Sequence, residues 1–133
     1  PPAPPRNQEV LARTQFDRSY KGAISVDDCA PDGKYVQLTN NSNMAQNIHG
    51  WRLRRDIDFG KQVVRYTFDD CVLEPRSSLR IWARGFKGPD APGRDLESSY
   101  STWGIGNFVK TTLYDPNGEK SLHLQLLPVL LYS

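Results

Sequence analysis

The chain has 133 residues and a formal net charge of +2, with 17 lysines and arginines against 15 acids. This length fits one domain with its own hydrophobic core, and the even balance of charge argues against a dedicated nucleic-acid domain. No apolar run approaches the roughly 20 residues that a membrane helix needs, which excludes membrane insertion by a helix.

The first 20 residues have the composition of a linker. The segment "PPAPP" favours an extended, semi-rigid backbone, and the residues that follow carry no sustained helical stripe. The chain also opens without a methionine and without the apolar core of a signal peptide, so we expect a fragment of a longer protein. We predict a flexible linker over 1–20 and one domain over 21–133.

From Lys21 onward, short runs alternate apolar and polar residues, as strands with one buried face do. Turn residues separate them, among them "PDG" at 31–33 and "DPNG" at 115–118. Seven runs follow this pattern: 23–26, 34–40, 51–55, 62–68, 78–85, 108–114 and 120–127. Their spacing predicts an all-β fold, a β-sandwich of about seven to nine strands without a long helix.

The alternation also predicts which side chains face inward. In the run 51–55, Trp51, Leu53 and Arg55 share one face, and Arg52 and Arg54 point the other way. In the run 78–85 the predicted inward residues are Leu79, Ile81 and Ala83. In the run 120–127 they are Leu122, Leu124 and Leu126. The residues predicted to face outward in these runs are Arg80, Trp82, Arg84 and His123.

No arrangement of residues indicates catalysis. The two histidines, His49 and His123, have no cysteine or acid at metal-ligand spacing. The acid pairs in "DIDF" (56–59) and "DLE" (95–97) would need a cleft to act as acid and base. The glycines of "WGIGN" are not followed by the helix that a phosphate cradle requires. We therefore predict no catalytic residues, no metal, no cofactor and no enzymatic activity.

The two cysteines, Cys29 and Cys71, lie on either side of Trp51 and imitate the order found in antibody domains. The spacing differs, because Trp51 lies about midway between them. We expect two unpaired thiols in a reducing compartment. A Cys29–Cys71 disulfide in an extracellular adhesion domain is the alternative.

The arginines on the outward faces form a candidate interaction face. Its members are Arg52, Arg54, Arg80, Trp82 and Arg84. Such a strip could bind an acidic partner or nucleic acid through charge and stacking. The alternative is structural: arginine stems cover apolar surface on sandwich strands and discourage pairing at sheet edges.

Six motifs in order resemble the lamin tail domain, an immunoglobulin-like sandwich of nuclear lamins and of many invertebrate cytoplasmic intermediate filament proteins. They are "KGAISVDDCAPDGKYVQLTNNS", "GWRLRR", "RYTF", "IWARG", "STWGIGN" and "LYDPNGE". The resemblance extends from about Lys21 to Leu127. It implies that certain residues shape the sandwich: Trp51, Ile81, Trp82, Trp103 and Gly104.

The resemblance implies a non-enzymatic module that projects from a coiled-coil rod. Residues 13–22 resemble the rod-to-tail junction of the cytoplasmic members, and residues 1–20 lack the basic nuclear-localisation cluster of lamins. We therefore expect the tail of a cytoplasmic filament protein that contacts other filament subunits and cytoskeletal or junction proteins, with the isolated domain monomeric or weakly associating. The alternative is a nuclear lamin tail that contacts nuclear-envelope proteins and chromatin through Arg52, Arg54 and Arg80.

Overall fold

The computed structural model describes residues 15–19 and 22–126, which form strands and connections without a helix. One sheet has five strands, in the order β1-β11-β10-β5-β6, and all of its pairs are antiparallel. Their bounds, in sheet order, are β1 (Gln15–Ser19), β11 (Lys120–Leu126), β10 (Phe108–Tyr114), β5 (Arg52–Ile57) and β6 (Gln62–Thr67).

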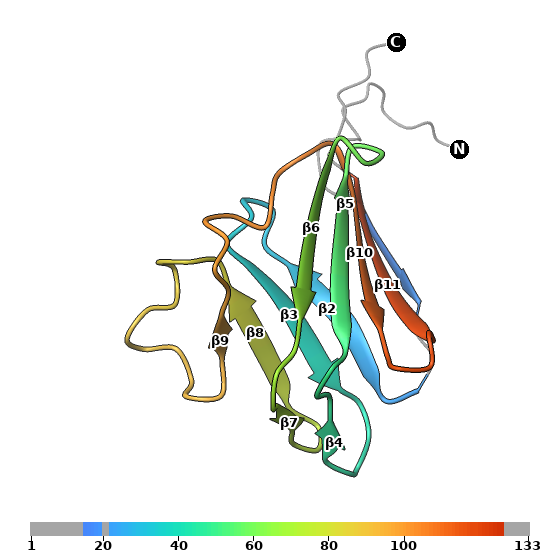
Figure 1. Cartoon of the computed structure of the whole chain (residues 1–133), viewed down its shortest axis with the longest axis vertical. Helices are drawn as coiled ribbons and strands as arrows, with labels where there is room; N and C mark the ends of the chain where they lie inside the picture. Colours follow the sequence, from blue (N-terminus) through green and yellow to red (C-terminus); the bar gives the residue numbers. More distant parts are fainter. Residues whose placement is uncertain (1–14, 20–21, 127–133) are drawn as a thin grey trace, which may run out of the picture.

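The second sheet has four strands in the order β2-β3-β8-β9 and faces the first (Figure 1). Its strands are β2 (Ile24–Cys29), β3 (Tyr35–Asn40), β8 (Ser78–Trp82) and β9 (Leu96–Glu97). A small pair, β4 (Gln46–Asn47) with β7 (Val72–Leu73), lies at one end of the sandwich. The predicted all-β sandwich is confirmed. Three of its strands span only two residues, too short to leave an alternating pattern in the sequence.

The core lies between the two sheets and is built by the predicted alternation. Leu53 and Ile57 of β5 meet Leu79 and Ile81 of β8 in one buried cluster. Trp103, with no exposed surface, fills the middle of this layer and donates its indole N–H to the Ile81 carbonyl oxygen at 2.9 Å. Burying these side chains is the main source of the stability of the sandwich.

Strand β11 corrects the prediction for its two faces. His123, expected to face outward, is buried with Ser121 and Gln125, whereas Leu126 is 41% exposed. The cause is register: Ser121, His123 and Gln125 pair with the inward row of β10, Leu113, Thr111 and Val109. Residues directly opposite each other in an antiparallel pair share a face, so β10 decides the orientation of β11.

The predicted linker contains a strand. Residues Gln15–Ser19 form β1 and pair with β11 from Leu126 back to Leu122. The rest of the linker predicted over 1–20 lies outside the described residues, so its flexibility and the domain boundary at residue 21 stay predictions. Because Gln15 lies opposite Leu126, the described chain enters and leaves the sandwich at the same end.

The residues expected to shape the sandwich hold buried or half-buried positions. Ile81 and Trp103 are fully buried, and Trp51 packs against the core from its edge. Gly104 has a φ of 92° and its backbone lies against Ile57, so that an added Cβ would overlap that side chain. Only glycine combines this backbone angle with such close approach.

Candidate functional site

The five residues of the candidate interaction face lie on two different surfaces. Arg52 and Arg54 lie on the outer face of β5, in the five-stranded sheet. Arg80 and Trp82 lie on the outer face of β8, in the four-stranded sheet, and Arg84 follows β8 in an exposed turn. The prediction of one strip was therefore wrong, because β5 and β8 belong to opposite sheets of the sandwich.

On the outer face of the five-stranded sheet, both candidate arginines already contact other residues of the domain. Arg54 binds Asp56 through two nitrogens, with Nε 3.1 Å from Oδ2 and Nη2 3.1 Å from Oδ1. These bonds and the charge of Asp56 raise the pKa of Arg54. Arg52 lies 5.7 Å from the centre of the Tyr114 ring, a cation–π distance. These contacts match the structural interpretation of outward arginines.

The surface on the four-stranded sheet is built differently, around Arg80. Its guanidinium lies 3.9 Å from the centre of the Tyr35 ring and 5.4 Å from that of Trp82. The two rings contact each other edge to face at 5.2 Å. Register explains the cluster, because Tyr35 pairs with Trp82 and Gln37 pairs with Arg80 across β3 and β8. Gln37 Oε1 accepts a hydrogen bond from Arg80 Nε at 2.9 Å.

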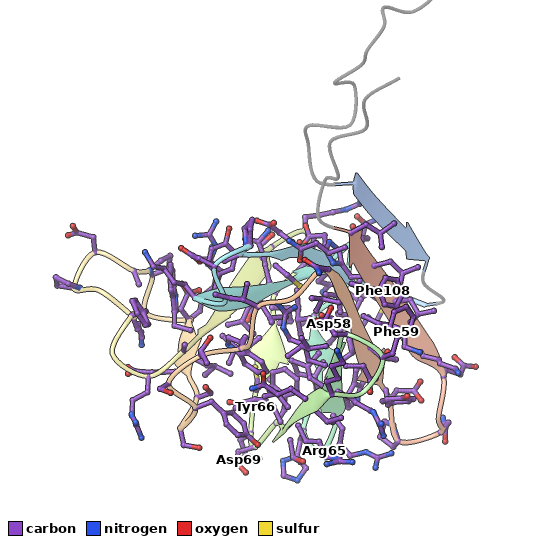
Figure 2. The ribbon with its side chains drawn as sticks, turned by 90° about the horizontal axis from the view of Figure 1, so that it is seen from above. Asp58, Phe59, Arg65, Tyr66, Asp69 and Phe108 are labelled. Atoms are coloured by element: carbon purple, nitrogen blue, oxygen red, sulfur yellow. The ribbon has the colours of Figure 1, made fainter. Side chains whose placement is uncertain are left out.

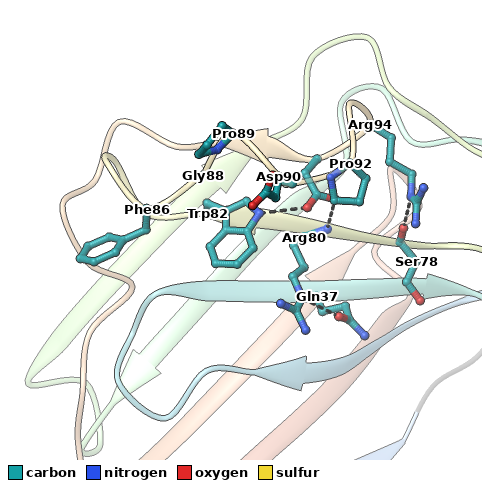
Figure 3. Close-up of a pocket in the computed structure, with 12 residues that line it drawn as sticks. Gln37, Ser78, Arg80, Trp82, Phe86, Gly88, Pro89, Asp90, Pro92 and Arg94 are labelled. Carbon is teal, nitrogen blue, oxygen red and sulfur yellow. Dashed lines mark hydrogen bonds between the residues drawn. The ribbon is translucent and has the colours of Figure 1, made fainter.

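A pocket of about 480 Å³ opens beside this cluster, under the connection 86–95 (Figure 3). Asp95 closes one side and is 5% exposed. Its carboxylate accepts the backbone N–H of Arg80 at 3.1 Å and the indole N–H of Trp82 at 2.9 Å. Asp95 therefore holds the Trp82 indole through one hydrogen bond and fixes the adjoining backbone of β8 through the other, with Trp82 half-buried at the pocket wall.

The alternation pattern found Arg80 and Trp82 but missed their neighbours in the pocket. The missed residues are Gln37, Phe86, Asp90 and Arg94, together with Tyr35 behind Arg80, and Asp95 was considered only as part of the acid pair at 95–97. All but Tyr35 and Gln37 belong to the connection 86–95, which has the composition of a plain loop. Tyr35 and Gln37 are on the outward row of their own strand, a usable signal once the pairing of β3 with β8 is known.

The acid pairs considered for catalysis have structural partners. Asp56 pairs with Arg54, and Asp58 Oδ1 accepts the backbone N–H groups of Asn107 and Phe108 at 2.8 and 3.0 Å. Asp58 thereby ties the β5–β6 hairpin to the start of β10. Figure 2 shows Phe59 at this tip beside Phe108; their rings stack at 4.8 Å although Phe59 is 85% exposed.

The remaining candidate chemistry is also accounted for in the described residues. Both cysteines are free thiols: Cys29 is buried, with its Sγ 3.6 Å from Thr111 Oγ1, and Cys71 is half-buried. The described part of the chain brings together no group of three metal-ligating side chains. Residues 15–19 and 22–126 also contain no helix long and apolar enough to cross a membrane.

Comparisons with known proteins show where the chain belongs. A model of the family described as Lamin Tail Domain matches residues 17–125. Muscle cell intermediate filament protein AV71 of Acanthocheilonema viteae is 43% identical over 124 residues, which cover 88% of this chain and 30% of the relative. Intermediate filament protein A of Ascaris suum is 40% identical over 121 residues, which cover 88% of this chain and 24% of the relative. Intermediate filament protein ifb-1 of Caenorhabditis elegans is 34% identical over 120 residues, which cover 88% of this chain and 20% of the relative.

The fold and these surfaces define a class, an immunoglobulin-like structural module with a filled interior and charged outer faces. The chain belongs to the lamin tail domain family. The predicted likeness to the tails of invertebrate intermediate filament proteins, in preference to nuclear lamins, is confirmed by the nematode relatives. The chain spans 20% to 30% of the length of these three relatives.

Proposed function

We propose that this chain is the globular tail of a cytoplasmic intermediate filament protein and that it acts, without enzymatic activity, in filament organisation and protein contacts. Its partners in this proposal are other filament subunits and cytoskeletal or junction proteins. The relatives support it, since their names describe intermediate filament proteins, one of them of muscle cells.

The observation that carries the proposal is that the described chain enters and leaves the sandwich at the same end. Gln15 at the start of β1 lies opposite Leu126 at the end of β11. A module attached at one end leaves both outer faces and its opposite end accessible, as suits a domain that projects from a rod and contacts partners. Several buried polar groups of the interior form structural hydrogen bonds, such as that of Ser121 Oγ to the Ile24 carbonyl oxygen at 2.7 Å.

The lamin alternative needs a chromatin-binding face made of Arg52, Arg54 and Arg80. The structure divides these residues between two sheets, and Arg54 already binds Asp56. An arginine that is paired internally releases fewer counterions on binding to DNA. The division of this face favours the cytoplasmic proposal.

Expression of the parent protein with a fluorescent tag, with and without residues 15–126, tests the proposal. We expect cytoplasmic filaments in both cases, and altered bundling or loss of partner attachment when the domain is deleted. Location at the nuclear rim would contradict it. A parent sequence without upstream heptads carrying apolar a and d positions would contradict it as well. Sedimentation of the 133-residue chain should show a monomer or weak association.

A further inference from the structure

The pocket under the connection 86–95 has the dimensions and the chemistry of a ligand site. Its volume of about 480 Å³ falls within the range of about 300–1,000 Å³ that small-molecule sites occupy. Ser78, Arg80 and Trp82 of β8 form one wall, spaced every second residue on the outer face. The opposite wall comes from Phe86, Pro89 and Pro92 (Figure 3).

Arg80 presents at this wall an oriented guanidinium whose two terminal nitrogens have no hydrogen-bond partner among the described residues. Its Nε is bound to Gln37, and the ring of Tyr35 supports its plane at 3.9 Å. Within the described residues, Nη1 and Nη2 of Arg80 have no hydrogen bond and no carboxylate within ion-pair distance. Two terminal nitrogens held in this way match the two oxygens of a carboxylate.

Arg94 has the same arrangement on the other side of the pocket. Its Nε donates to the Ser78 carbonyl oxygen at 2.6 Å, which directs the side chain back toward β8. Its two Nη groups likewise have no partner in the part of the chain that the structure describes. The pocket thus carries two guanidinium groups, each positioned through Nε and each with its terminal nitrogens available.

The carboxylates of the pocket differ from each other. Asp95 is buried and already accepts two N–H groups, from the Arg80 backbone and the Trp82 indole. Asp90 is exposed, and the described residues offer it no hydrogen bond or ion pair. Asp90 therefore opposes an acidic ligand through the like charge, and removing its charge should strengthen binding.

We propose that this pocket binds an acidic, extended peptide segment of a partner protein. A carboxylate of the peptide would bind the terminal nitrogens of Arg80 or Arg94, and an adjacent apolar side chain would lie against Trp82 and Phe86. An extended peptide fits because its side chains repeat at the spacing of Ser78, Arg80 and Trp82 along β8. This inference rests on the proposed function, because it names the chemistry of one protein contact.

The first test is a selection of short, randomised peptides displayed on phage against the 133-residue chain. We expect enrichment of aspartate and glutamate beside an apolar or aromatic residue. Binding of the most enriched synthetic peptide should shift the indole N–H signal of Trp82, which Trp82→Phe identifies. Enrichment of proline or of basic residues, or no enrichment above background, would overturn the proposal.

The second test measures the affinity of that peptide for variants by fluorescence anisotropy. Arg80→Gln and Arg94→Gln should each weaken binding about tenfold or more, since each removes charge-assisted bonds. The matched control Arg52→Gln, on the other sheet, should leave the affinity unchanged, and Asp90→Asn should raise it. Arg94 contacts no aromatic ring among the described residues, so Arg94→Gln keeps the test valid even if Arg80→Gln disturbs the cluster.

An equal loss in the Arg52→Gln control, or full binding by the Arg80→Gln and Arg94→Gln variants, would refute a site at this pocket. These measurements use the purified chain and do not depend on filaments. A negative result in the peptide-binding tests therefore would not contradict the proposed function as a tail module. Nuclear location of the parent protein, in turn, would not contradict peptide binding at the pocket.

Discussion

Arg55 donates a hydrogen bond from its Nε to the backbone carbonyl oxygen of Trp103 at 2.7 Å, in the middle of the sandwich. Its Nη1 binds Thr111 Oγ1 at 2.8 Å and its Nη2 binds the Gly104 carbonyl oxygen at 3.3 Å. The arginine is 1% exposed and has no carboxylate partner among the described residues. It joins β5 to the connection that brings Trp103 into the core.

Replacing Arg55 by methionine should therefore destabilise the domain although it removes a buried charge. Burial lowers the pKa of Arg55, but the carbonyl oxygens of Trp103 and Gly104 would lose their guanidinium donor, and the Thr111 hydroxyl would keep only the Cys29 thiol. An unsatisfied buried group costs about 1–3 kcal/mol, so we expect a loss of that size or larger in the free energy of unfolding, measured with urea. The control Arg54→Met removes a pair on the outer face of β5, which water reaches, and should move the midpoint less. Equal effects would contradict the role of Arg55.

Trp103→Ala should lower the free energy of unfolding by about 3–5 kcal/mol, the usual range for removing a large core side chain. The ring has no exposed surface and contacts Tyr66 edge to face. Trp103→Phe keeps most of the packing but leaves the Ile81 carbonyl oxygen without the indole N–H, so its loss should be smaller. Calorimetric melting of both variants measures the difference. An unchanged melting temperature in Trp103→Ala would contradict the buried placement.

Alanine variants of two glycines should distinguish the cost of backbone strain from the cost of steric overlap. Gly104 and Gly85 have similar φ angles, 92° and 89°, but an added Cβ at Gly104 meets Ile57, whereas Gly85 has nothing within 4 Å. Both alanine variants should cost about 1–2 kcal/mol for the left-handed backbone. Gly104→Ala should cost a further 1–3 kcal/mol or so for overpacking. Equal urea midpoints for the two variants would show that Ile57 moves aside freely.

Tyr35 should make stability fall at alkaline pH. Burial, followed by the hydrogen bond and negative charge of Asp28, raises the pKa of Tyr35 from 10.0 to about 12. Below pH 10 both states hold the proton, so the contribution is complete; it is lost as the pH rises from 10 to about 12, because the unfolded chain ionises first. Tyr35→Phe should show a shallower decline over this interval in urea unfolding. Identical slopes would contradict the raised pKa.

The two thiols should differ in reactivity. Burial raises the pKa of Cys29 and of Cys71, but Cys29 is inaccessible and Cys71 is half-buried. Because the thiolate is the reactive form, Ellman's reagent should modify Cys71 slowly in the native chain and Cys29 only after unfolding. Cys71→Ser should leave no reactive thiol in the native state. A non-reduced chain that shows no thiol even when unfolded would indicate a disulfide and contradict the structure.

Much of the fold follows from two local patterns in the sequence, the alternation of apolar and polar residues and the placement of turn residues. In β5 and β8 the inward row is apolar apart from Arg55, which has a long apolar stem, and the structure buries the residues that alternation places inward there. Turn residues mark the ends of these strands because few residue types adopt the required backbone angles. Alternation states which side chains share a face, and in these two strands the more apolar row is the buried one. In β11 it misled, because the leucine row is the more apolar but Ser121, His123 and Gln125 are the buried residues.

Three features depended on contacts between distant segments. The inward face of β11 is set by its register with β10, which turned His123 inward and Leu126 outward. The arginines of β5 and β8 went to opposite sheets because strand order, which alternation does not specify, divides them. Arg55 became a central donor only because the connection at Trp103 crosses above it.

The sequence by itself determined the class of the protein: a two-layer β fold of the lamin tail family, since side-chain period and ordered motifs are local properties of the chain. The tertiary structure alone decided where a partner could bind. The pocket at Arg80 needs β3, β8 and the connection ending at Asp95 to meet, and hydrogen bonds between these segments hold two guanidinium groups with their terminal nitrogens unpaired.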